Sequence, residues 1–191
     1  MVVLVVGANG QLGERCTAAL ASRGQAVRAS VRDPQRGAVL QRSGVELVRL
    51  DVTDPAQRRH AVTGVDTVLV TANSVVPRAG DRPSQMDRSL HDLVDDAEAA
   101  GVQLFVLPSV PVTNVDAHVP YVRARRELEQ RLASSSMSSW VLRFPPFMEC
   151  WFALVGSSVP LRGERYRPLG VRRRSWGSSA GAPEPWSSSA G

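Results

Sequence analysis

The chain has 191 residues, 43% of them hydrophobic and 21% charged, a balance typical of a soluble globular domain with a buried core. Its net charge of +5 lies mostly at the C-terminal end, where residues 157–191 hold six of the 23 basic residues and two of the 18 acidic ones. The remainder is nearly neutral, which argues against nucleic acid as a partner.

Short apolar runs alternate with helical patterns from Val2 to Leu142. Six runs read as strands: Val2–Val6, Ala26–Val31, Val45–Leu50, Val65–Thr71, Val102–Leu107 and Ser139–Leu142. Helices are predicted between them, at Leu12–Ser22, from Asp33-Pro34, and at Pro55–Val62, Ser84–Ala100 and Val119–Ala133. This alternation predicts right-handed βαβ units and an α/β fold of the Rossmann type, a doubly wound parallel sheet in the order 3-2-1-4-5-6.

The predicted domain occupies residues 1–156. Residues 157–191 are expected to be a partly disordered basic tail, because a composition rich in Ser, Gly and Arg buries too little apolar surface to fold. Arg172, Arg173 and Arg174 form a basic run in this tail. The run could be a nucleic-acid or membrane patch, but the composition favours a solvated tail.

Two features bear on the compartment. Cys16 and Cys150 form no C-x-x-C pair and no disulfide framework, which suits a reducing environment. The apolar-leaning stretch 140–155 is interrupted by Arg143, two prolines and Glu149, which argues against a transmembrane helix. Because the first predicted strand starts at residue 2, we expect no signal peptide, no membrane partner and a cytoplasmic protein.

The first predicted strand leads directly into three glycines, Gly7, Gly10 and Gly13, and a helical pattern follows. Gly7 permits a tight turn, Gly10 lets the backbone approach a dinucleotide pyrophosphate, and Gly13 lets the helix pack closely on the strand. The helix N-terminus then offers free N–H groups to the anion. The predicted cofactor-binding residues of this turn are Gly7, Asn9, Gly10, Gln11, Leu12 and Gly13. The alternative is a purely structural turn.

The end of the second predicted strand bears on the identity of the dinucleotide. An acidic residue there would accept from the ribose 2′-OH of NAD, but Val31 occupies that place and Arg32 follows. The forked guanidinium of Arg32 can hold a 2′-phosphate, so we expect NADP rather than NAD. Alternatively, Arg32 is a surface residue and Asp33 caps the next helix.

Two further loops complete the predicted cofactor site. Asp51 and Val52 follow the third strand, in the loop that lines the adenine in such folds, and Asp51 could also cap the next helix. Ala72 and Asn73 follow the fourth strand, where small and polar residues suit the close passage of a cofactor.

A candidate catalytic set lies near the fifth strand. Tyr121 and Arg125 are four residues apart on one helical face, and a phenol beside a fixed cation can act as a general acid or base. Ser109, after the fifth strand, could hold a substrate carbonyl. Alternatively, Arg125 and Glu129 form an ion pair on a solvated face, and Tyr121 merely starts the helix.

Metal and nucleophile chemistry is not indicated. His60, His91 and His118 are well separated, and none has metal-ligand spacing with another ligand, so no metal site is predicted. All 23 basic residues are arginine, so no lysine is present to form a Schiff base or to act in catalysis.

Several of these stretches together resemble the NmrA-like group of atypical short-chain dehydrogenases/reductases. They are Gly7–Gly13, Val27–Pro34, Ala99–Val102 and, as the more specific mark, Leu142–Glu149. The resemblance implies an NADP-binding Rossmann domain followed by a small substrate region. It also implies one of two roles: reduction of a small carbonyl or quinone-like compound, or non-catalytic redox sensing and regulation.

The chain departs from this family in three places. Arg125 stands where the superfamily motif Tyr-x-x-x-Lys has lysine, and Pro108 precedes Ser109 where a second small polar residue is usual. Family members are also longer, so we expect an incomplete C-terminal substrate region. The expected consequence is weak or absent carbonyl reduction by these 191 residues, even with the cofactor bound.

Overall fold

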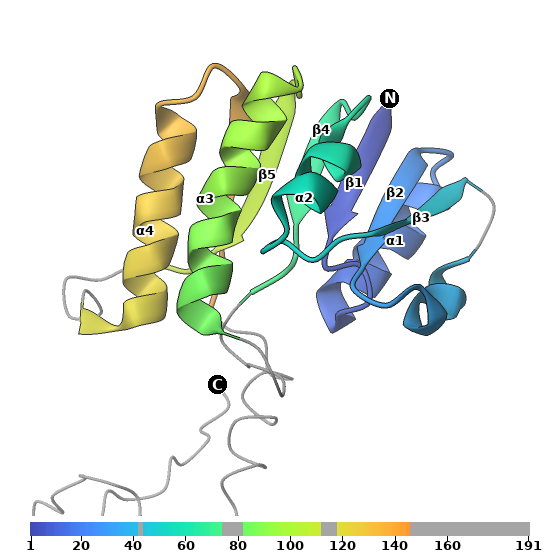
Figure 1. Cartoon of the computed structure of the whole chain (residues 1–191), viewed down its shortest axis with the longest axis horizontal. Helices are drawn as coiled ribbons and strands as arrows, with labels where there is room; N and C mark the ends of the chain where they lie inside the picture. Colours follow the sequence, from blue (N-terminus) through green and yellow to red (C-terminus); the bar gives the residue numbers. More distant parts are fainter. Residues whose placement is uncertain (42–43, 74–81, 112–117, 146–191) are drawn as a thin grey trace, which may run out of the picture. The chain divides into compact units, whose positions relative to one another are not determined.

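A computed structural model describes residues 1–41, 44–73, 82–111 and 118–145 of the chain. Six strands form one parallel sheet in the order β3-β2-β1-β4-β5-β6, as predicted (Figure 1). The strands are β1 (Val2–Val6), β2 (Ala26–Val31), β3 (Val45–Arg49), β4 (Thr67–Val70), β5 (Leu104–Ser109) and β6 (Ser138–Arg143). The helices are α1 (Gln11–Ala21), the 3-10 helix η1 (Pro34–Leu40), α2 (Pro55–Val62), α3 (Pro83–Ala99) and α4 (Pro120–Ala133).

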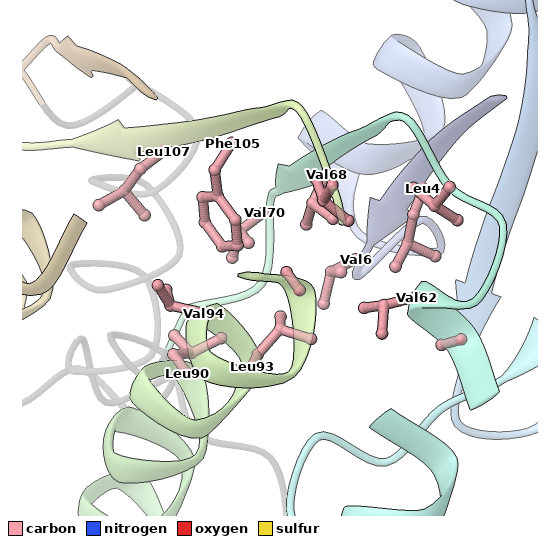
Figure 2. Packing of buried hydrophobic residues seen from close by; sticks show 14 of the residues in the cluster. Leu4, Val6, Val62, Val68, Val70, Leu90, Leu93, Val94, Phe105 and Leu107 are labelled. Carbon is pink, nitrogen blue, oxygen red and sulfur yellow. The ribbon is translucent and has the colours of Figure 1, made fainter. Parts of the chain in front are cut away.

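Alternating side chains of the strands pack into two separate cores, one on each face of the sheet. Leu4 and Val6 of β1 belong to a core that also contains side chains of α2, α3 and α4, whereas Val3 and Val5 belong to the core on the α1 side. Figure 2 shows the first core, in which Phe105 of β5 and side chains of β1 and β4 gather against α2 and α3. The central strands β1 and β4 are buried on both faces, as near-continuous apolar strands of a parallel sheet require, whereas Trp140 and Leu142 of the edge strand β6 are exposed.

Arginine side chains join the helices on this first face. The Nε and Nη2 atoms of Arg58 in α2 lie 2.8 Å from Asp96 and 3.1 Å from Asp92, both of α3. The Arg58 side chain also donates to the Val52 carbonyl at 2.8 Å. Arg131 of α4 donates to Glu98 of α3 at 2.7 Å. These contacts join α2, α3 and α4 into one layer on this face of the sheet.

The observed elements differ from the predicted ones mainly at their ends. β5 runs through Pro108 to Ser109, two residues further than predicted, because both residues pair with the edge strand β6. The boundary at residue 156, the tail 157–191, Cys150 and most of Leu142–Glu149 lie outside the described residues. No helix in the described part of the chain is long and apolar enough to cross a membrane.

Candidate cofactor-binding and active site

The predicted cofactor residues gather at the carboxyl edge of the sheet. Gly7 follows β1, Arg32 follows β2, Asp51 comes shortly after β3, and Ala72 comes shortly after β4. The chain changes sides at β1: β2 pairs with one edge of β1, and β4 pairs with the other. Ligands of open α/β sheets bind at such a switch point, outside the carboxyl ends of the strands.

Close packing explains two of the three glycines. Gly7 has a φ of +85°, and a Cβ there would lie 2.8 Å from the Ala72 nitrogen. A Cβ on Gly13 would lie 2.2 Å from the Gly7 oxygen, so α1 could not pack on the turn. The predicted roles of Gly7 as the turn and Gly13 as the close contact are confirmed. A Cβ on Gly10, by contrast, would meet only the Gly7 oxygen, at 3.3 Å.

The N-terminus of α1 has no side-chain cap. Its N-cap residue is Gly10, whereas the N-cap residue of α2 is Asp54, whose carboxylate accepts from the amides of Ala56 and Gln57. The first amides of a helix have no partner within the helix, so a phosphate can accept from them where no cap does. Gln11 is exposed at this end, and Asn9 and Leu12 are half-buried. The turn therefore fits a dinucleotide pyrophosphate.

Arg32 is exposed directly after β2, at the edge where the 2′-substituent of a bound adenosine is expected. The neighbouring Asp33 accepts from the Gln35 amide at 3.0 Å and is the N-cap residue of η1. Asp33 therefore caps the helix, as the alternative interpretation held.

Asp51 does not cap α2, which corrects that part of the sequence interpretation. Its Oδ1 atom accepts from the Thr53 amide at 3.0 Å and the Thr53 hydroxyl at 2.8 Å, and the cap is Asp54. The two acids are three residues apart, and Pro55 at the first helical position places the cap at Asp54. Val52 is half-buried and packs against the first core.

The residues after β4 contact the glycine turn. The amides of Thr71 and Ala72 donate to the Val6 carbonyl at 2.8 and 3.0 Å, which brings the Ala72 backbone against Gly7. Ala72 is half-buried and Asn73 is exposed. The structure thus brings Ala72 to the predicted phosphate turn, as its place after the fourth strand indicated.

Arg125 is buried, which overturns the alternative of an Arg125–Glu129 ion pair on a solvated face. Its side chain is 2% exposed, its Nη2 atom donates to the Ala72 carbonyl at 3.1 Å, and its guanidinium lies 5.2 Å from the centre of the Tyr121 ring. Among the residues that the structure describes, Nε and Nη1 of Arg125 have no hydrogen-bond partner. α4 therefore places a phenol and a cation together beside the loop after β4.

Ser109 has a different partner from the one that its predicted role needs. Its hydroxyl donates to the Glu129 carboxylate at 2.5 Å, and Arg143 at the end of β6 also binds this carboxylate. Burial raises the pKa of Glu129, but hydrogen bonds from Arg143 and Ser109 outweigh it, so the pKa lies below its ordinary value. Glu129 thus stays ionised and holds the Ser109 hydroxyl, joining α4, β5 and β6.

Two hydroxyls at the turn were not predicted as site residues. The Ser30 hydroxyl accepts from the Gly7 amide at 3.1 Å, and the Thr71 hydroxyl lies 3.2 Å from the Gly7 carbonyl oxygen. The only sequence signal was a polar residue near the end of an apolar strand, at both positions. Neither sequence position nor spacing shows which backbone atom such a hydroxyl reaches.

For metals, no group of three or more His, Cys, Asp or Glu side chains within the described ranges could hold an ion.

Comparison with known proteins identifies the family. Residues 7–149 match the NAD(P)H-binding family. The chain is 30% identical over 175 residues to NAD(P)H azoreductase of Xenophilus azovorans, which covers 92% of this chain and 58% of the azoreductase. The chain thus spans less than two thirds of that relative's length.

Solved structures agree with the architecture. A short-chain dehydrogenase/reductase superfamily protein of Agrobacterium tumefaciens with bound NAD is 28% identical, with a TM-score of 0.62 over 75% of this chain and 49% of the other. A mutant of NmrA has the same fold, at 22% identity and a TM-score of 0.59, over 73% of this chain and 43% of NmrA. The chain belongs to the NAD(P)H-binding family, with structural neighbours in the NmrA-like group of short-chain dehydrogenases/reductases.

Proposed function

We propose that this protein binds NADP(H) across the glycine turn and reduces a small carbonyl or quinone-like compound. The observation that carries the proposal is the difference among the three glycines. Neighbouring backbone leaves no room for a side chain at Gly7 or Gly13, whereas Gly10 is the N-cap residue of α1 and provides no side-chain cap. That arrangement leaves backbone N–H groups facing the place where a pyrophosphate would lie.

NADP is the proposed cofactor because of Arg32. An exposed guanidinium directly after β2 suits a 2′-phosphate, which it can bind through two N–H groups. A carboxylate at that strand end would instead favour the free 2′-hydroxyl of NAD, but Val31 occupies the end of β2.

Tyr121 is the proposed general acid. A reduced nicotinamide, when bound, would supply the hydride for reduction of the carbonyl carbon. Tyr121 then donates its phenolic proton to the carbonyl oxygen, and the guanidinium 5.2 Å from the ring centre stabilises the phenolate that forms. We propose that Arg125 serves in this way and by holding the Ala72 carbonyl.

Ser109 favours a second candidate, a regulatory protein that binds NADP(H) without turnover. Its hydroxyl is bound to the ionised Glu129, so it is not free to donate to a substrate carbonyl unless that bond is exchanged. Arginine also stands in place of the family's lysine, so Tyr121 is the one proton donor that we propose. A site with so few catalytic groups favours binding without turnover.

The experiment that separates the two candidates follows NADPH absorbance with a panel of aldehydes and quinones. We expect turnover by the 191 residues below the usual enzymatic range of about 1–1000 per second. Tyr121→Phe should abolish it while leaving the Kd for NADPH unchanged. Tight NADPH binding with no consumption would support the regulatory candidate. Full consumption in Tyr121→Phe would show that another group donates the proton.

A further inference from the structure

The Gly7 peptide is held by two hydroxyls that come from opposite sides. The Gly7 amide donates to the hydroxyl oxygen of Ser30 at 3.1 Å, and the Thr71 hydroxyl lies 2.8 Å from the Val6 carbonyl and 3.2 Å from the Gly7 carbonyl. Ser30 belongs to β2 and Thr71 follows β4, the two strands that flank β1. The turn at the switch point is therefore tied to both of its neighbours.

These hydrogen bonds orient the peptide groups of Gly7, a residue without a side chain of its own. Gly7 has a φ of +85° and no side chain, so only contacts with its backbone can fix the orientation of its two peptide groups. Its carbonyl also accepts from the Gly10 amide at 3.0 Å, which closes the turn before α1. A shift of the Gly7 carbonyl would therefore move Gly10 and the first amides of α1.

We propose that Ser30 and Thr71 are positioning residues that hold the glycine turn in the orientation that binds the cofactor pyrophosphate. This rests on the proposed binding of NADP(H) at the turn. Ser30 is 2% exposed, and Thr71 is half-buried with its hydroxyl 2.8 Å from where a Cβ on Gly13 would lie, so both hydroxyls are placed against the turn. Preorganised amides bind an anion without the cost of ordering them first.

The variants that test this remove each hydroxyl with little change of shape. They are Thr71→Val, Ser30→Ala and the double variant, with Thr71→Ser as the conservative replacement. Two matched controls remove buried hydroxyls elsewhere. Thr17→Val removes a hydroxyl of α1 that has no hydrogen-bond partner among the described residues, and Ser89→Ala removes one that donates to the Gln85 carbonyl within α3.

The first readout is the Kd for NADPH of the whole chain, measured by calorimetry. We expect each single variant to weaken binding about five- to tenfold, the scale of one hydrogen bond, while Thr71→Ser and both controls stay within about twofold. Because both hydroxyls hold the same residue, the double variant should lose little more than either single one. If the Kd of the double variant instead rose by the product of the two single increases, the hydroxyls would act independently, which would contradict a shared role.

The second readout needs no cofactor. Exchange of the Gly7 amide with solvent, followed by NMR, should accelerate in Ser30→Ala and remain slow in Ser89→Ala. A lowered unfolding temperature with an unchanged Kd and unchanged exchange would overturn the proposal and leave a merely structural role. If the parental chain binds neither NADPH nor NADH, the proposed function is wrong and so is a role in cofactor binding. The exchange rates would then report only whether the hydroxyls hold the turn.

Discussion

Gly7, Gly10 and Gly13 look equivalent in the sequence, but the fold needs them for different reasons. A Cβ at Gly7 or Gly13 would collide with backbone atoms at 2.8 or 2.2 Å, so these two are required by the folded chain itself. At Gly10 the nearest atom is 3.3 Å away, and the backbone has a φ of −83° that any residue can adopt. A Cβ there would need a shift of only a few tenths of an ångström, and space for a pyrophosphate is the role that we propose for this glycine.

Gly10→Val should therefore abolish NADPH binding and cost the folded chain little. The side chain would occupy the approach of the pyrophosphate, while the loss of a good N-cap residue costs about 1 kcal/mol of stability. Calorimetry and thermal unfolding measure the two effects. Ala19→Val introduces the same side chain on the exposed side of α1 and is the control. Equal NADPH affinity in Gly10→Val and the parent would refute the site.

Between elements, the buried Arg58 of α2 binds two carboxylates of α3, while its neighbour Arg59 is exposed. Arg58→Met should destabilise the chain by about 2–3 kcal/mol, because Asp96 loses its charge partner where it is largely buried. Arg59→Met makes the same chemical change and should shift stability by no more than about 0.5 kcal/mol. Urea unfolding of both variants measures this; equal losses would mean that the α2–α3 contact contributes nothing.

The contact between α3 and α4 should make stability depend on pH. Hydrogen bonds from Arg131, and then from the Ser136 amide and hydroxyl, lower the pKa of Glu98 to about 2 from an ordinary 4.5. The unfolded chain thus binds a proton at higher pH than the folded chain. This contribution to stability is present above pH 4.5 and is lost as the pH falls toward 2.

Glu98→Gln should accordingly flatten the fall in unfolding temperature between pH 5 and pH 2.5, two pH values chosen to bracket the transition. Glu127→Gln removes an exposed carboxylate of α4 and is the charge-matched control. A parental pH profile in Glu98→Gln would show that the Arg131 contact does not lower the free energy of the folded state.

For the whole molecule, the cofactor should act as a stabilising ligand. A ligand that binds only the folded chain adds about 2.7 kcal/mol at one hundred times its Kd. At equal concentrations, NADPH should raise the unfolding temperature more than NADH does.

Arg32→Ala should narrow the difference between the NADPH and NADH affinities about tenfold or more, the value of a charge-assisted contact. Arg59→Ala removes the same charge from α2 and should keep the preference; tighter NADH binding by the parent would contradict NADP as the cofactor.

The sequence alone determined the architecture of this protein. Apolar runs such as Val2–Val6, spaced by amphipathic helices, predict a parallel sheet, and the strand order is that of the Rossmann pattern that the glycine turn after the first strand indicates. The glycine turn was also legible, because its chemistry is local: a strand, a turn without side chains and a helix are consecutive in the chain.

Only the tertiary structure decided which polar groups meet. The sequence left Arg125 with Tyr121 or Glu129 of its own helix as alternative partners, and the packing of α4 buries it beside Tyr121, where it donates to the Ala72 carbonyl. Ser109 likewise binds Glu129, twenty residues away, and the hydroxyls of Ser30 in β2 and of Thr71 just after β4 lie against Gly7. Local periodicity is set by the backbone geometry of each segment, whereas hydrogen-bond partners distant in sequence depend on how the finished elements pack.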